Sequence, residues 1–231
     1  MKNVKDVAIM VQARLSSQRC PQKMIRPFAN TTLMDLCLKK LSLSTIPKEN
    51  IWVSVHEPEL MDICRNYPVQ IFHRSKKSAM SEGTPMTDMY EWWDKIPQKY
   101  VVLVNACAPF MTLETIERFY FAYCNSCKDG MFGVTENKNY YWNSNYELIT
   151  PWPENQAVMN TKVVDCTYEA AHCLYGGKTS KIKDGIWMGD FTKHGDIELF
   201  PMAKKEIFDI DYEWEFDYYE GLYKIMFSQN L

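Results

Sequence analysis

Short apolar runs alternate with helix-like patterns through the first half of the chain. Four runs have the composition and length of buried strands: residues 6–12, 51–55, 69–73 and 100–106. Four segments are predicted as helices from apolar spacing and helix-start residues: residues 31–43, 57–65, 88–96 and 113–126. This alternation predicts an α/β fold with a mostly parallel sheet. In such sheets ligands bind at the carboxyl ends of the strands, so the loops after them are candidate site walls.

The second half of the chain has a different pattern. From residue 131 onward, short aromatic-rich segments alternate with Asn, Pro and Glu turns, which predicts antiparallel β-hairpins. Residues 168–177 are expected to form a return strand, and residues 206–227 a strand, an acidic turn and a helix. Five aromatic residues are more than a lone surface flap needs, and they predict a partner surface: Tyr140, Tyr141, Trp142, Tyr146 and Trp152.

Composition narrows the classes of function. The 231 residues suit one domain, or one domain with an appended lobe. A formal net charge of -3 gives no overall field toward nucleic acid or acidic membranes, so any anion site must be local. No stretch has the apolar length of a membrane span, and the N-terminus lacks the features of a signal peptide. We therefore expect neither a nucleic-acid nor a membrane partner.

The eight cysteines are scattered, and only Cys124 and Cys127 form a CxxC pair. The four histidines lie far apart, so the chain does not present the ligand spacing of a structural zinc site. We interpret the cysteines as reduced thiols of a cytoplasmic protein, most of them packing residues.

The loop after the first predicted strand gathers cations and hydroxyls. Arg14, Arg19 and Lys23 stand beside Ser16 and Ser17, with no glycine. Arginine can form paired bonds to a phosphate, and lysine supplies a mobile point charge. Phosphate loops usually rely on glycine, however, so a phosphate site and a basic surface loop both remain open.

Two other short motifs carry candidate chemistry. Asp209 and Asp211 lie two residues apart, so on a strand both would face the same side. Such a pair is stabilised by a cation, and magnesium suits it, although a solvated acidic strand end is the alternative. Asn105 lies at the end of the predicted strand 100–106, in the turn NACAPF, where it either bonds a ribose or sugar hydroxyl or belongs to an ordinary strand-to-helix connection.

Taken together, these motifs resemble the cytidylyltransferases that make CMP-activated sugar acids. This family includes the CMP-sialic acid synthetases, the CMP-3-deoxy-octulosonate synthetases and the spore-coat polysaccharide enzymes. The opening stretch QARLSSQRCPQK carries the resemblance at six positions: Ala13, Arg14, Ser17, Arg19, Pro21 and Lys23. The closing stretch FDIDYEWEFDYYEGLY is similar to the family's last strand and helix.

The resemblance implies a Rossmann-like nucleotidyltransferase with helices on both faces of its sheet. Residues 1–231 would form one domain, with residues 136–175 as a β-rich arm that pairs two chains into a homodimer. The enzyme would transfer CMP from CTP to a ulosonic or sialic-type sugar acid for surface glycan biosynthesis.

The resemblance also implies roles for individual residues. Catalysis is expected from Arg14, Lys23, Asp209 and Asp211, the two aspartates holding Mg²⁺. The nucleotide-binding set is Ala13, Arg14, Ser16, Ser17, Arg19, Lys23, Arg74 and Thr84. Asn105 and Lys162 are the acceptor-binding candidates.

Two departures leave alternatives open. Cys107 stands where many members of the family have an aspartate, and Met24 stands where the sialic acid branch has an asparagine. The Arg-Arg-Gln segment of that branch has no counterpart here, and Lys162 is its candidate substitute. One alternative is a non-catalytic nucleotide- or glycan-binding partner subunit of the same fold. The other is a nucleotidyltransferase for a different acceptor, such as a sugar phosphate or phosphonate.

Overall fold

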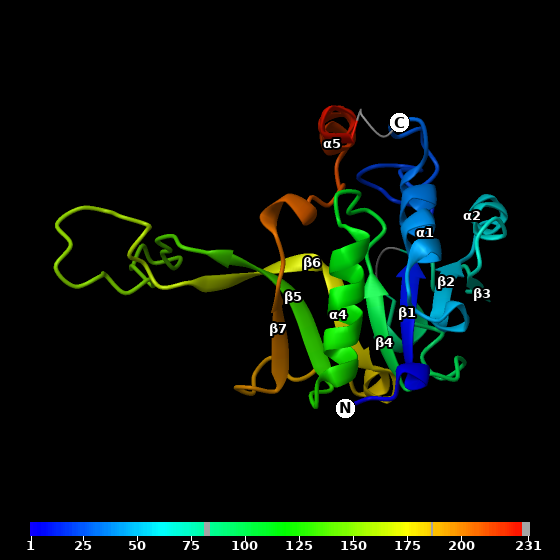
Figure 1. The fold of residues 1–231 in the computed structure, drawn as a ribbon, viewed down its shortest axis with the longest axis horizontal. Helices are drawn as coiled ribbons and strands as arrows, with labels where there is room; N and C mark the ends of the chain where they lie inside the picture. Colours follow the sequence, from blue (N-terminus) through cyan, green and yellow to red (C-terminus); the bar gives the residue numbers. More distant parts are fainter. Residues whose placement is uncertain (81–83, 186, 228–231) are drawn as a thin grey trace.

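A computed structural model describes residues 1–80, 84–185 and 187–227. Its centre is a seven-stranded sheet with the strand order β3-β2-β1-β4-β6-β5-β7 (Figure 1). The strands are β1 Val7–Gln12, β2 Ile51–Val55, β3 Gln70–His73, β4 Tyr100–Val104, β5 Gly130–Asn137, β6 Thr167–Lys178 and β7 Ile197–Pro201. The predicted α/β class is confirmed, and the four strands predicted in the first half are present with small shifts at their ends.

Strand β1 is the point where the chain changes direction across the sheet. The chain runs from β1 outward to β2 and β3, and then returns so that β4 pairs with the other side of β1. These pairs are parallel, as is β5 with β7, whereas β6 is antiparallel to both of its neighbours. The diverging connections after β1 and β4 leave a crevice at their carboxyl ends, which is where doubly wound sheets bind ligands.

Alternate side chains of β1 enter two separate apolar clusters. The larger cluster contains Val7, Ile9 and Val11. The smaller cluster lies on the opposite face of the sheet and contains Ala8 and Met10. The helices are α1 Leu33–Leu43, α2 Pro58–Cys64, α3 Met86–Met89, α4 Leu113–Asn125 and α5 Glu213–Phe227. Four 3-10 turns accompany them: η1 Val4–Asp6, η2 Lys48–Asn50, η3 Thr179–Asp184 and η4 Lys204–Glu206. Within the described residues, no helix combines the length and apolar character needed to span a membrane.

Threonine side chains cap two of these helices at their N-termini. The Thr32 hydroxyl accepts a hydrogen bond from the backbone N–H of Asp35 at 3.0 Å, which caps α1. Thr112 caps α4 in the same way, and its own backbone N–H donates to the buried Glu206 at 3.1 Å. This network fixes the start of α4 directly after the β4 turn.

The predicted helix over residues 88–96 is wrong. Helix α3 ends at Met89, and the chain continues through turns in which Tyr90 and Trp92 both pack against Trp187. Two residues that are two positions apart point to nearly opposite sides of a helix. Placing both rings on one partner therefore requires the helix to stop.

The predicted strand over the segment that contains Asp209 and Asp211 is also wrong. Residues 207–211 form no strand, although the Ile210 N–H donates to the Cys107 carbonyl at 3.0 Å. Strand β7, which the sequence pattern did not reveal, precedes this segment and pairs with β5. The helix predicted after it is present as α5.

The segment between β5 and β6 extends away from the sheet (Figure 1). Strands β5 and β6 pair as the predicted antiparallel hairpin, but residues 138–166 contain only the isolated bridge between Trp142 and Leu148. The β-rich character predicted for residues 136–175 therefore holds at the base of the arm and not at its tip. Large apolar side chains are exposed on it, among them Trp142, Tyr146 and Val158. The homodimer that they suggest stays a prediction.

Candidate active site

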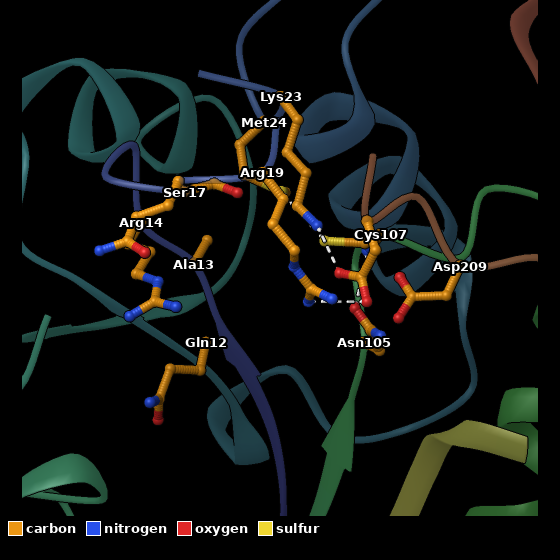
Figure 2. A pocket seen from close by; sticks show the side chains of 12 residues that line it. Gln12, Ala13, Arg14, Ser17, Arg19, Lys23, Met24, Asn105, Cys107 and Asp209 are labelled. Atoms are coloured by element: carbon orange, nitrogen blue, oxygen red, sulfur yellow. Dashed lines mark hydrogen bonds and ion pairs between the residues drawn. The ribbon is translucent and has the colours of Figure 1, made fainter. Parts of the chain in front are cut away.

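A cavity of about 450 Å³ lies at the carboxyl ends of β1 and β4 (Figure 2). Eight of the predicted site residues line it: Ala13, Arg14, Ser17, Arg19, Lys23, Asn105, Asp209 and Asp211. Four other residues complete the lining: Gln12, Gln18, Met24 and Cys107. The opening loop and the closing segment, far apart in the sequence, thus form opposite walls of one cavity at the predicted edge of the sheet.

The opening loop keeps its shape without glycine because its backbone is anchored at several points. The Ala13 N–H donates to the Ser54 carbonyl at 3.2 Å, and the Leu15 N–H donates to Glu57 Oε1 at 2.9 Å. Gln22 adopts a left-handed conformation with φ of 56°, and its N–H donates to the Leu15 carbonyl at 3.2 Å. The tight return that glycine usually permits is therefore made by a glutamine held in place by its neighbours.

The cations of this loop face the closing segment. Arg19 Nη2 lies 2.8 Å from Asp211 Oδ2, and Lys23 Nζ lies 3.4 Å from Asp211 Oδ1. The buried Lys23 ammonium also donates to the Ile210 carbonyl. Arg19 and Lys23 extend from one side of the cavity toward the wall that carries Asp209 and Cys107, and Arg14 lies on the far side (Figure 2). This arrangement favours an anion site over a plain basic surface loop.

Among the described residues, Asp211 forms ion pairs with two cations, whereas Asp209 forms none. Asp209 Oδ1 is buried and has no hydrogen-bond partner among the described residues. Burial and then the nearby Asp211 charge raise the pKa of Asp209, with Lys23 acting in the opposite direction. A carboxylate in this position is stabilised by a nearby cation, and carboxylate oxygens are ligands that Mg²⁺ prefers.

The cavity walls fit a metal held by two carboxylates. Within the described residues, no group of three or more His, Cys, Asp or Glu side chains is arranged as a metal site. Magnesium is commonly bound by one or two carboxylates together with substrate phosphates. Asp209 and Asp211 fit that mode, in which the remaining ligands come from outside the chain.

Cys107 does not replace the missing aspartate as an anion. Desolvation by burial raises the pKa of its thiol to about 11, against a smaller opposing effect of Lys23. The thiol is therefore neutral near pH 7, and its sulfur lies 3.7 Å from Met24 Sδ. Burial lowers the pKa of Lys23, but Cys107, Asp209 and Asp211 outweigh it and raise the pKa overall, so this ammonium stays charged.

The other predicted site residues lie outside this cavity. Arg74 is buried and donates to the Ala13 carbonyl, and it lines an adjoining cavity of about 250 Å³ together with Arg14. Ser16 Oγ donates to the Ala79 carbonyl at 3.2 Å. Thr84 precedes α3, and Lys162 is exposed in the arm; neither is part of the cavity lining. Arg74 and Ser16 therefore support the loop in this structure.

Sequence reasoning missed several residues around the site. Gln12, at the end of β1, donates to the Met89 carbonyl at 3.1 Å and accepts from Trp92 Nε1 at 3.0 Å. It lines the cavity described above and a second, aromatic cavity that also includes His172 and Trp187. One signal in the sequence was the Gly-Gly pair inside β6, because glycine in a strand interior often marks a close approach of another group. A Cβ on Gly177 would lie 2.2 Å from the Trp187 ring.

Known proteins share the sequence pattern and the fold of this chain. A family model described as cytidylyltransferase matches residues 8–229. A curated 3-deoxy-manno-octulosonate cytidylyltransferase of Rickettsia felis is 27% identical over 150 residues, covering 63% of this chain and 51% of that protein. The protein of the same name from Rickettsia akari is 25% identical over the same length and coverage. This chain thus spans about half the length of the curated relatives it matches.

Solved structures with low sequence identity share the fold. A CMP:2-keto-3-deoxy-manno-octonic acid synthetase complexed with CTP aligns with a TM-score of 0.68 at 11% identity, covering 97% of this chain and 99% of that one. A 4-diphosphocytidyl-2C-methyl-D-erythritol synthase from Anaerococcus prevotii gives 0.63 at 12% identity, covering 94% and 96%. A cytidylyltransferase from Leptospira borgpetersenii gives 0.62 at 14% identity, covering 95% and 87%.

Proposed function

The chain belongs to the cytidylyltransferase family, and we propose that it transfers CMP from CTP to a hydroxyl of a sugar acid, releasing pyrophosphate. The observation that carries the proposal is the cavity in which Arg19 and Lys23 face Asp209 and Asp211. The names of the curated relatives support a sugar acid acceptor, and a ulosonic or sialic-type acid for surface glycans is the form we propose.

In this reaction the acceptor oxygen bonds to the α-phosphorus of CTP, and the bond from that phosphorus to the bridging oxygen breaks. The hydroxyl gives up its proton to solvent, and pyrophosphate leaves with the bridging oxygen. Arg14, Arg19 and Lys23 would bind the triphosphate and offset the charge that grows on the leaving group. Lys23 is well suited because its buried ammonium is fixed by the Ile210 carbonyl.

Asp209 and Asp211 would hold Mg²⁺. When bound, the ion would offset phosphate charge and lower the pKa of the acceptor hydroxyl. Asp211 already shares its two oxygens between Arg19 and Lys23, so binding of a triphosphate gives these cations a second set of anionic partners. Asp211 would therefore orient the two cations, and both aspartates would offer metal ligands.

The remaining predicted contacts are part of the same proposal. Backbone at Ala13, positioned by Arg74, would face the base together with Thr84. Asn105 has both ends of its amide engaged, since Oδ1 accepts from the Cys107 N–H and Nδ2 donates to the His172 carbonyl, so its role is to position the turn as well as to face the acceptor.

Lys162 lies in the exposed arm and does not line the cavity. An arm from a second copy of the chain would have to bring it to the acceptor, so its role and the homodimer form one proposal. All eight cysteines are unpaired, which supports a reducing compartment such as the cytoplasm.

Pyrophosphate release tests the function. Purified protein would be incubated with CTP, Mg²⁺ and a panel of sugar acids, with sugar phosphates and phosphonates as the alternative acceptors. Release with a sugar acid supports the proposal, and release only with a phosphate or phosphonate supports a different acceptor. CTP binding without turnover on the whole panel supports the non-catalytic subunit that Cys107 and Met24 suggested.

A further inference from the structure

The β4–α4 turn, residues 105–111, connects the cavity proposed for CTP with the segment that carries its two aspartates. Asn105 and Cys107 of this turn line the cavity (Figure 2). The Cys107 carbonyl accepts a hydrogen bond from the Ile210 N–H at 3.0 Å. Because Ile210 stands between the two aspartates in the chain, the position of both depends on where the turn lies.

A lysine of α1 is bonded to the far end of the same turn. Lys40 Nζ donates to the Pro109 carbonyl at 2.6 Å and to the Met111 carbonyl at 2.7 Å. Hydrogen bonds from a charged donor are stronger than those from a neutral one. One side chain thus joins two carbonyls that lie two residues apart, and this fixes the path of the turn between them.

Very little space separates α1 from the β4–α4 turn. The void between them has a volume of about 10 Å³, and residues of both elements line it, among them Lys40, Asn105 and Pro109. A void of this size holds at most about one water molecule. Solvent there cannot replace both hydrogen bonds of the ammonium, so its removal would leave the carbonyls of the turn without adequate partners.

The ammonium occupies this position at a cost. Burial lowers the pKa of Lys40, and the nearby Cys37 and Glu206 oppose that effect. An apolar side chain of the same length would avoid the cost of removing a charge from water. The gain that offsets this cost is the pair of hydrogen bonds to the turn.

A buried carboxylate holds the residues that follow the turn. Glu206 is 5% exposed and accepts hydrogen bonds from the Thr112 N–H at 3.1 Å and from the Thr115 hydroxyl at 2.9 Å. It is the last residue of η4, so this contact joins the start of α4 to the segment that leads to Asp209. The turn is therefore fixed by a cation at its far end and by an anion directly after it.

We propose that Lys40 is a positioning residue for the transfer: by fixing the β4–α4 turn, it holds Asn105, Cys107 and, through Ile210, the two aspartates opposite the cations of the opening loop. This inference rests on the proposed function. Lys40 is not part of the cavity lining, so it would contact neither CTP nor the acceptor. Its loss should slow the chemical step by misaligning these groups, with little effect on the binding of CTP.

Labelling of Cys107 tests the contact without substrate or metal. Lys40→Met keeps the length of the side chain and removes the ammonium, and Lys39→Met makes the same change at the exposed neighbouring position of α1. Iodoacetamide labelling followed by mass spectrometry would measure the rate at Cys107, with the exposed Cys127 as internal reference. Burial protects the Cys107 thiol, so we expect this rate to rise about tenfold or more in Lys40→Met and to stay within about twofold in Lys39→Met.

Pyrophosphate release with CTP, Mg²⁺ and a sugar acid is the second measurement. In Lys40→Met we expect kcat to fall about tenfold or more while KM for CTP changes by less than about threefold, because alignment in the transition state is lost and binding of the triphosphate is kept. Lys39→Met should keep both constants. If Lys40→Met does not fold, Lys40→Gln replaces it, and the same directions are expected because only a neutral donor remains.

Unchanged labelling of Cys107 in the Lys40 variant would overturn the inference, as would a normal kcat in a variant whose Cys107 is labelled faster. An equal rise at the buried Cys64 of α2 would show general loosening of the fold and would also overturn it. If the wild type releases no pyrophosphate with any sugar acid, the proposed function fails and the positioning role fails with it. The labelling rates then still decide whether Lys40 holds the turn, so the two failures are distinguishable.

Discussion

The two cavities at the end of the sheet are assembled in different ways. The first is lined mainly by two short charged segments, the loop after β1 and the residues before α5, each of which is recognisable in the sequence. The second gathers single aromatic residues from the turn after α3, from strands β5 and β6 and from the segment after η3. The charged residues of the first cavity therefore lie close together in the sequence, whereas the shape of the adjoining cavity depends on packing between residues far apart in the sequence. Substitutions in the first cavity should lower the turnover rate, and substitutions in the second should change acceptor binding or the stability of the fold.

The largest effect is expected from the carboxylates of the first cavity. Asp209→Asn and Asp211→Asn should each lower kcat a hundredfold or more, about 2.7 kcal/mol in activation free energy, because each removes a proposed metal ligand. Steady-state pyrophosphate release measures this effect. Asp217→Asn, an exposed acid on α5, is the matched control and should stay near the wild-type rate. Near-normal turnover in both cavity variants would reject the metal-binding role.

The next largest effect is expected from the buried Lys23. Lys23→Met keeps the length of the side chain but removes the ammonium that faces Asp211, and we expect kcat/KM for CTP to fall about tenfold to a hundredfold. Lys39→Met, on the exposed face of α1, makes the same change outside the cavity. Equal kinetics of the two variants would contradict a role for Lys23 in binding the triphosphate.

The same Gly→Ala substitution at two positions tests the packing of Trp187 against β6. Gly177→Ala should destabilise the protein by about 1–3 kcal/mol, because the new methyl group overlaps the Trp187 ring and its carbonyl. Gly221→Ala, inside α5 with nothing within 4 Å of the added carbon, should stabilise by about 0.5–1 kcal/mol. Thermal unfolding should therefore shift in opposite directions for the two variants. A shift of the same sign would show that Trp187 adjusts without cost.

The smallest effect is expected at Cys107. A thiol with a pKa of about 11 is protonated at pH 7, so Cys107→Ala should leave the Mg²⁺ concentration for half-maximal activity within about twofold of the wild type. The small fraction of thiolate rises only as the pH approaches that pKa. Alkylation by iodoacetamide at pH 7.5, followed by mass spectrometry, should label the exposed Cys127 and Cys166 before Cys107. Rapid labelling of Cys107 would indicate an activated thiolate instead.

The same difference between local and long-range features separates what could be predicted from the sequence from what could not. Strands β1 to β4, helices α1 and α4 and their threonine caps were predictable because each depends on local periodicity and on one capping hydroxyl. The cations and aspartates of the first cavity were predictable because each set is contiguous in the chain. The early end of α3 depends on the packing of Tyr90 and Trp92 on Trp187, a residue almost a hundred positions away. The bulge at His172 depends on the mismatch between β5 and β6, which no local pattern encodes.

We propose that the first cavity holds a cytidine triphosphate whose CMP moiety is passed to a sugar acid. The most direct measurement is pyrophosphate release with CTP and with each of the other three nucleoside triphosphates, using a sugar acid acceptor and Mg²⁺. We expect release with CTP that depends on both the acceptor and Mg²⁺, and that is lost in Asp209→Asn. Release that does not require the acceptor, or no release with CTP on any sugar acid, would contradict it.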